Sequence, residues 1–136
     1  MGSQENLQAV KDIYTAFDRG EIDAIIDVLA DDVEWGCTTV ATEVPWLGVV
    51  TGRGNVREQF FDPIPEHAEM HLFERDEFAA SDNHVAVTWR GEFTVKRTGD
   101  KVSARGMHFW TFGPDGKVTR YQHFTDTAAE LAAWRG

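Results

Sequence analysis

The sequence predicts one α+β domain over residues 1–136, in which three helices precede a curved antiparallel sheet that forms a cone around an internal pocket. In the first third of the chain, apolar residues recur every three or four positions, a spacing typical of helices. From residue 68 onward they recur at every second position, which is typical of strands. The chain also contains five Trp and nine Phe, aromatic surface that can line such a pocket.

The helical part is divided by turn residues. Ser3 is the expected N-cap of the first helix, and Gly20 is expected to end it. A second, shorter helix follows, and an acidic turn leads from it into a strand over residues 33–37. Residues 38–54 form an irregular loop, a type of segment that often carries function, and residues 55–61 form a third helix. The stripe of the first helix consists of Leu7, Val10, Tyr14 and Phe17.

The second half of the chain is predicted to be a meander of strands closed by a short helix. The expected strands cover residues 70–78, 84–96, 102–112 and 117–125, and the helix covers residues 127–134.

Two of these strands bring candidate functional residues together. His108 alternates with Trp110 and Phe112 on one strand, as Asp126 alternates with Gln122, Phe124 and Val118 on the next. If Phe112 pairs near Val118, both sets share one face, and His108 and Asp126 look into the same aromatic space. A carboxylate and an imidazole buried in such a space either reduce the stability of the fold or serve a function.

Composition narrows the function classes. The net charge of −10 disfavours nucleic acid as a partner. Cys37 is the only cysteine, so no disulfide can form within the chain, and a cytoplasmic location is expected. No apolar run is long enough to span a membrane, so a membrane is not expected as a partner. Neither a metal site nor a cofactor is expected, because His67 and His71 lack further ligands nearby and no glycine-rich phosphate loop is present.

Several motifs together resemble the nuclear transport factor 2-like superfamily, and most of all its SnoaL-like polyketide cyclase and ketosteroid isomerase-related branch. The resemblance spans nearly the whole chain. It is carried by the opening from Tyr14 through Asp31-Asp32 to Trp35, by Gly52-Arg53-Gly54 with Phe60-Phe61, and by Phe112-Gly-Pro-Asp-Gly116 ending in Asp126-Thr127.

The resemblance implies roles for particular residues. Tyr14 resembles the tyrosine that donates a hydrogen bond to the substrate oxyanion in ketosteroid isomerases. His108 with Asp126 resembles the histidine and aspartate of SnoaL-like cyclases. Cys37 occupies the place of the isomerases' general-base aspartate, which argues against steroid isomerisation by that route. The Arg-x-Asp motif of limonene epoxide hydrolases is absent, since Trp89-Arg90-Gly91 stands there.

Each candidate also has a purely structural interpretation. Asp126 can be only the N-cap of the last helix, His108 a core histidine, and Tyr14 a packing residue of the first helix. The leading expectation is a cofactor-free isomerase, cyclase or hydratase that uses Asp126, His108 and Tyr14 on a carbonyl or enol substrate. The alternatives are a non-catalytic ligand-binding module and a dimerisation module.

Two further expectations concern partners and the pocket wall. The partners are a small apolar organic ligand and a second copy of the chain, bound through the outer face of the sheet. The expected pocket-lining residues are Phe17, Trp35, Cys37, Trp46, Phe60, Trp89, Trp110, Gln122 and Phe124.

Overall fold

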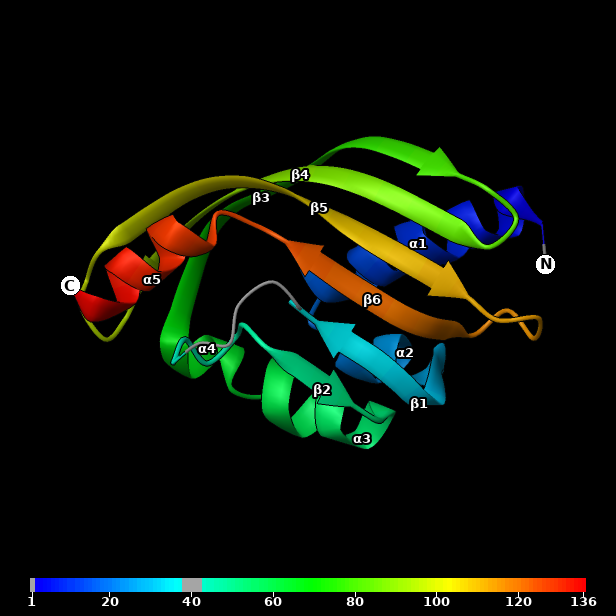
Figure 1. Cartoon of the computed structure of the whole chain (residues 1–136), viewed down its shortest axis with the longest axis horizontal. Coiled ribbons are helices and arrows are strands. Elements are labelled where there is room, and N and C mark those ends of the chain that lie inside the picture. Colours follow the sequence, from blue (N-terminus) through cyan, green and yellow to red (C-terminus); the bar gives the residue numbers. More distant parts are fainter. Residues whose placement is uncertain (1, 38–42) are drawn as a thin grey trace.

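A computed structural model describes residues 2–37 and 43–136 of the chain. It has the predicted α+β architecture, a single curved and unclosed sheet with helices from the N-terminal half laid against it (Figure 1). The sheet has six strands in the order β2-β1-β6-β5-β4-β3. The strands are β1 (Leu29–Gly36), β2 (Val49–Thr51), β3 (Ala68–Ala80), β4 (His84–Val95), β5 (Lys101–Phe112) and β6 (Val118–Phe124).

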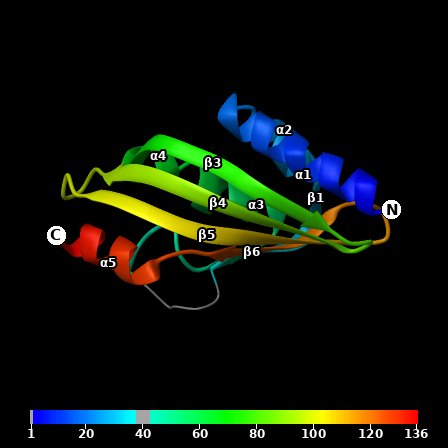
Figure 2. The same cartoon turned by 90° about the horizontal axis from the view of Figure 1, so that it is seen from above.

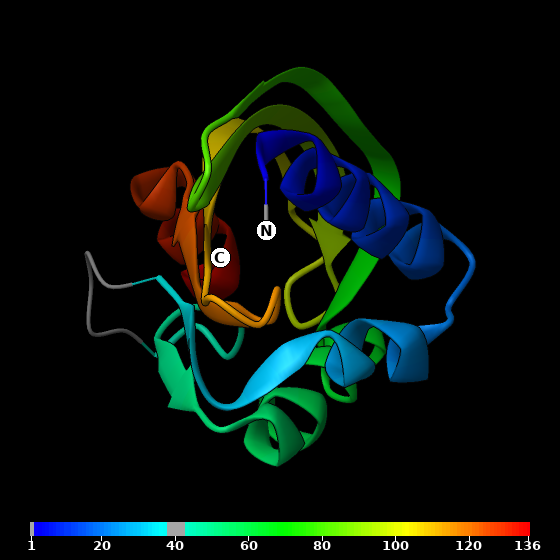
Figure 3. The same ribbon diagram turned by 90° about the vertical axis from the view of Figure 1, so that its right-hand side faces the viewer.

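The helices lie in two groups. Figure 3, which looks along the long axis, shows the sheet curving round with α1 lying across its concave side. Figure 2 places α5 at the far end of the long strands from the N-terminus. The helices are α1 (Ser3–Asp18), α2 (Ile22–Asp27), α3 (Arg53–Val56), the π-helical turn η1 (Arg57–Phe61), α4 (Ile64–His67) and α5 (Thr127–Arg135).

The core lies where the predicted apolar faces of the helices and strands meet. On α1 the residues Val10, Ile13 and Tyr14 are buried, and every second residue of β4 from Val85 to Val95 is buried or glycine. These two apolar faces meet and form the main core, because each element is amphipathic at its own period. A second core cluster lies at the other end of the sheet, where Ala133 of α5 packs near Phe93 and Val102.

The structure corrects the sequence expectations at four places. Asp31 and Asp32 lie inside β1 and not in a turn before it. Gly2, rather than Ser3, is the N-cap of α1, and its backbone N–H donates to the Glu5 carboxylate at 2.6 Å. The strand β2 lies inside the segment that was expected to be an irregular loop. The sheet is not antiparallel throughout, because β1 pairs with β6 in parallel. The chain enters β1 from α2 and reaches β6 only at the end of the meander, so no hairpin forces these strands to be antiparallel.

Among the described helices none is long and apolar enough to cross a membrane.

Candidate functional site

A cavity of about 130 Å³ lies between the concave face of the sheet and the helices α1, η1 and α4. Its wall is almost entirely apolar and aromatic, with a few polar groups that converge on it, as is typical of small-molecule sites. The structure therefore brings most of the expected wall together. The predicted residues that line the cavity are Tyr14, Phe17, Trp35, Trp46, Phe60, Trp89, His108 and Trp110.

Tyr14 of α1 and His108 of β5 form the central polar contact of this wall. The Tyr14 hydroxyl lies 2.7 Å from Nδ1 of His108, and both side chains are buried. Nε1–H of Trp110 donates to the same hydroxyl at 3.2 Å. Because an indole can only donate, the Tyr14 hydroxyl accepts from Trp110 with one lone pair. Toward His108 it either donates its proton or accepts with its other lone pair.

The contact continues to a residue that the sequence analysis did not single out. Nε2 of His108 lies 3.0 Å from Nδ1 of His123 on the neighbouring strand β6. The Tyr121 hydroxyl lies 3.3 Å from that same Nδ1. Tyr14, His108 and His123 therefore form one hydrogen-bonded row across three elements, and each of the three lines the cavity.

Burial keeps every member of this row neutral. Burial lowers the pKa of His108 well below 6.5, and the neighbouring His123 lowers it further. Burial also lowers the pKa of His123 to about 4. The pKa of the Tyr14 hydroxyl is raised by burial, although Trp110 opposes that shift. At pH 7 the site therefore presents neutral imidazoles and a neutral phenol.

The cavity also has a carboxylate, supplied by Glu130 of α5. Its side chain is buried, and burial raises its pKa. Trp46 Nε1–H donates to Oε1 at 2.6 Å, and the Thr125 hydroxyl donates to Oε2 at 2.5 Å. Glu130 shares a helix face with Ala133 and Trp134 at positions i+3 and i+4, which is a signal for burial that the sequence contains.

Asp126 does not join the site. It is the N-cap of α5, its side chain is exposed, and Oδ1 accepts a hydrogen bond from the Ala129 N–H at 3.0 Å. It is not among the residues that line the cavity, so the expected convergence of Asp126 with His108 does not occur. The carboxylate that reaches the cavity is Glu130, one turn further along the helix.

A bulge in β6 explains this correction. Phe112 pairs with Val118 as expected, but Thr111 pairs with Arg120, so β6 gains one residue at Thr119. An extra residue reverses which side chains face inward beyond it. His123 therefore lies opposite His108 and faces the cavity.

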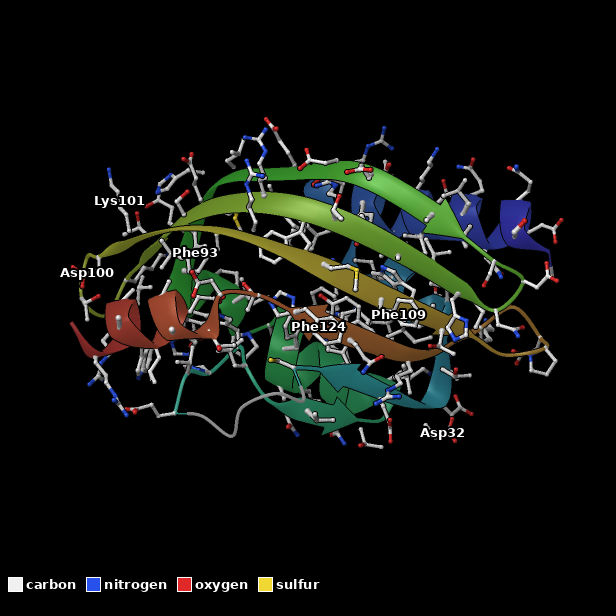
Figure 4. All side chains as sticks on the ribbon, turned by 45° about the horizontal axis from the view of Figure 1, so that its top comes forward. Asp32, Phe93, Asp100, Lys101, Phe109 and Phe124 are labelled. Carbon is white, nitrogen blue, oxygen red and sulfur yellow. The ribbon has the colours of Figure 1, made fainter. Side chains whose placement is uncertain are left out.

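The residues of β6 that alternate with Tyr121 and His123 turn outward. Gln122 and Phe124 were expected to line the pocket, but they pair with Phe109 and Met107 on the outer face instead. Figure 4 labels Phe109 and Phe124 on these two neighbouring strands.

Cys37 was also expected in the pocket wall, but it is not among the residues that line the cavity. It is buried in a small apolar cluster with Val44 and Leu47, next to the end of β1. The glycine at position 36 places it there, since φ is +135° at Gly36 and a Cβ would lie 1.9 Å from the carbonyl oxygen of Gly48. Within the described residues no cluster of His, Cys, Asp and Glu could hold a metal ion.

Comparison with known structures gives close matches over the whole chain. A nuclear transport factor 2-like protein from Burkholderia xenovorans LB400 is 29% identical, with a TM-score of 0.86 and 98% of each chain covered. The protein TerC, co-crystallised with polyporic acid, is 26% identical, with a TM-score of 0.82 and coverage of 97% of this chain and 99% of that one.

An LEH-like epoxide hydrolase from M. tuberculosis is only 12% identical, with a TM-score of 0.73 and coverage of 98% of this chain and 91% of that one. This likeness shows the shared fold alone. No curated protein matches the chain significantly. The family described as SnoaL-like domain matches residues 10–121, which span nearly all of the elements that build the cavity. The chain therefore belongs to the SnoaL-like domain family, within the nuclear transport factor 2-like superfamily.

Proposed function

We propose that the protein binds a small ring-containing carbonyl or enol compound in the cavity and converts it by acid–base chemistry without a cofactor. Isomerisation, cyclisation and hydration all belong to this class. The observation that carries the proposal is the hydrogen bond between Tyr14 and His108, buried in an otherwise apolar and aromatic wall. Buried polar groups that converge on an apolar cavity with shifted pKa values are typical of catalytic sites.

The dimensions and the lining favour a compact ring as the ligand. A cavity of about 130 Å³ is close to the ~150 Å³ cavity that accepts benzene in another protein. Trp35, Trp110 and Tyr14 line this space, and Trp110 packs edge-to-face against both of the other rings. Such an aromatic wall suits an aromatic or unsaturated ligand. The co-crystallisation of TerC with polyporic acid agrees with a ring compound that carries oxygen functions.

Acid–base chemistry follows from the polar groups. A phenol in water-poor surroundings can donate a strong hydrogen bond to a carbonyl oxygen on which negative charge develops. The neutral imidazoles can accept a proton without first losing one, since burial disfavours their cationic forms.

A second candidate function is ligand binding without turnover, and one observation favours it. Both oxygens of Glu130 already accept hydrogen bonds, from Trp46 and Thr125, so the carboxylate in the cavity wall is not poised as a base. The absence of turnover with retained binding would select this alternative.

We also propose that two copies associate through the outer face of the sheet. On β5 and β6 that face carries Met107, Phe109 and Phe124, all half-buried and close to each other in the ladder. An apolar patch on both copies suits a two-fold symmetric interface.

The ketone 2-indanone tests the central proposal, because it has one carbonyl and acidic hydrogens beside it on a compact ring system. We expect saturable quenching of tryptophan fluorescence, since Trp35, Trp89 and Trp110 line the cavity. In D₂O we expect the protein to accelerate the loss of the α-hydrogen signals in proton NMR, and Tyr14→Phe to slow this exchange about 100-fold or more.

The control is Ala68→Phe, which adds a ring to the cavity wall and should abolish both effects. Equal quenching by the wild type and by this filled variant would show that the cavity is not the binding site. Binding without exchange would reject the catalytic proposal in favour of ligand binding alone.

A further inference from the structure

The row Tyr14–His108–His123 has two ends that border one cavity. Tyr14 supplies a hydroxyl at one end, and His123 supplies an imidazole at the other. Within the described residues, Nε2 of His123 has no hydrogen-bond partner, while its Nδ1 is engaged with His108. A ligand in the cavity can therefore meet a group that gives a proton and a second group that takes one.

The row can exist in two internally consistent arrangements. In the first, the Tyr14 hydroxyl donates to Nδ1 of His108, and Nε2–H of His108 donates to Nδ1 of His123, which leaves a proton on Nε2 of His123. In the second, every bond is reversed, so the hydroxyl proton of Tyr14 and the bare Nε2 of His123 are both directed away from the row. Both arrangements use the same two contacts of 2.7 and 3.0 Å.

We propose that Tyr14, His108 and His123 form a neutral two-ended proton relay that interconverts a ketone carrying an α-hydrogen with its enol. This inference rests on the proposed function and names its substrate class and a catalytic residue, His123, that the sequence did not indicate.

The reaction starts from the second arrangement and ends in the first. The C–H bond beside the carbonyl breaks, and its proton moves to Nε2 of His123, while its electron pair forms the C=C bond. The proton on Nδ1 of His123 moves to Nε2 of His108, the proton on Nδ1 of His108 moves to the Tyr14 oxygen, and the Tyr14 proton moves to the carbonyl oxygen. The carbonyl π electrons become the new O–H bond, so there is no net oxidation or reduction and no net charge forms.

The surroundings suit a relay that stays uncharged. An imidazolium or a phenolate would lose its hydration in this cavity, and the pKa shifts of all three groups disfavour those charged forms. Because His123 takes a proton from carbon while Tyr14 gives one to the carbonyl oxygen, neither ion has to form. Tyr14 on α1 protonates the substrate oxygen, and His123 on β6 takes the proton from the α-carbon. His108 on β5 connects these two residues by a hydrogen bond to each.

Other titratable groups surround the relay on several elements. The guanidinium of Arg75 on β3 lies 4.9 Å from the centre of the Tyr14 ring and pairs with Asp18. Tyr121 contacts His123, and its pKa is raised by burial and further by the charges of Tyr14, Cys37 and Glu130. A neutral relay predicts an exchange rate that is flat between about pH 6 and 8.

The first test reads the imidazoles directly by two-bond ¹H–¹⁵N NMR, with His108→Gln and His123→Asn used for assignment. We expect both rings to be neutral from pH 6 to 8 and their tautomers to be matched, with the proton on Nε2 of both or on Nδ1 of both. An imidazolium at pH 7, or His108 protonated on Nε2 together with His123 protonated on Nδ1, would overturn the relay whatever the activity.

The second test uses 2-indanone exchange in D₂O. His123→Asn can keep a hydrogen bond to His108 but cannot pass a proton, so we expect a loss of about 100-fold or more in exchange with unchanged quenching. Asp126→Asn serves as the control and should exchange like the wild type. If Tyr14→Phe abolishes exchange and His123→Asn leaves it intact, the relay is wrong while the proposed function stands.

Discussion

At the scale of single residues, the site is governed by burial more than by charge pairing. The phenol of Tyr14, the imidazoles of His108 and His123 and the carboxyl of Glu130 each have a pKa shifted toward the neutral form, with burial as the largest cause. Hydrogen bonds within the row satisfy Tyr14, His108 and His123 without ionising them, and Trp46 and Thr125 satisfy Glu130. The shifts therefore have consequences both for chemistry and for stability.

One consequence is a loss of stability in mild acid. In the unfolded chain a histidine binds a proton below its ordinary pKa of about 6.5, whereas His123 in the fold does so only near pH 4. The unfolded state then holds more protons, so the free energy of unfolding falls as the pH drops from 6.5 to 4, by roughly 3 kcal/mol at most for this residue.

Urea unfolding of the wild type and of His123→Asn at pH 7.5, 6, 5 and 4.5 measures this contribution. The difference between the two proteins removes the opposing effect of Glu130, whose raised pKa favours the folded state as the pH falls. We expect the wild type to lose stability more steeply than the variant. Parallel curves would show that His123 is protonated equally in both states.

Asp126 should matter for the helix and not for the chemistry. Asn is as good an N-cap as Asp, so Asp126→Asn should change the free energy of unfolding by only a few tenths of a kcal/mol. Asp126→Ala removes the bond to the Ala129 N–H and should cost about 1 kcal/mol. Chemical denaturation measures both changes. A large loss of exchange activity in Asp126→Asn would contradict a purely structural role for Asp126.

At the scale of elements, the position of one bulge decides which strand residues form the site. The alternation of β5 is regular where it passes the cavity, so His108 and Trp110 lie inside as the sequence predicts. The extra residue at Thr119 reverses β6, which brings in Tyr121 and His123 and turns out Gln122 and Phe124. Nothing in a single sequence marks this insertion, because a bulge depends on how two strands pair.

The close approach of β4, β5 and β6 depends on Gly106. A Cβ at this position would lie 2.1 Å from the carbonyl oxygen of Phe124 and 2.4 Å from Cζ2 of Trp89. Trp89 in turn lies with its ring nearly parallel to that of His123, at 5.6 Å between ring centres. Gly106 therefore leaves room for the Trp89 indole, which lines the cavity beside His123.

Gly106→Ala should destabilise the fold by about 1–3 kcal/mol, because both neighbours must move. It should also shift the tryptophan emission, since Trp89 leaves its present position. Gly54→Ala is a matched control, because a Cβ there meets nothing within 4 Å and alanine favours a helix. Equal stability of the two variants would contradict the close packing at Gly106.

The contact between Trp46 and Glu130 joins the segment before β2 to α5. Glu130→Gln keeps an oxygen that can accept from Trp46, whereas Glu130→Leu leaves a partly buried indole N–H without a partner. We expect the Leu variant to lose about 1–3 kcal/mol and the Gln variant much less, as measured by thermal unfolding. The opposite order would show that the buried charge of Glu130 itself destabilises the fold.

At the scale of the whole molecule, the two faces of the sheet have different surroundings. The concave face encloses the cavity, while the outer face of β5 and β6 carries Met107, Phe109 and Phe124. The ring of Phe109 also stacks on His84 at 4.9 Å between centres. The same bulge therefore shapes both the candidate active site and the surface through which we propose that two copies meet.

A charge on that surface should separate the copies. Phe109→Glu places like charges against each other across a two-fold interface, and we expect it to convert a dimer into a monomer in sedimentation velocity. Thr15→Glu adds the same charge to the exposed side of α1 and should leave the mass unchanged. A monomeric wild type, or a dimeric Phe109→Glu variant, would exclude this interface.

The sequence by itself determined the order of the long elements, the apolar faces of α1 and β4, the family, and two polar residues of the cavity wall, Tyr14 and His108. Tyr14 and His108 could be predicted because helical and strand periods are local properties that each element carries alone. The stripe from Val10 to Tyr14 and the alternation around His108 do not change when the elements meet.

Only the tertiary structure decided the rest. The parallel pairing of β1 with β6, the inward turn of His123, and the choice of Glu130 over Asp126 all depend on contacts between distant segments. Register and bulges are set by how strands fit beside one another, and a shift of one residue exchanges the inside for the outside. Local patterns can therefore name the strand that lines a cavity, but the partner strand decides which of its side chains reach it.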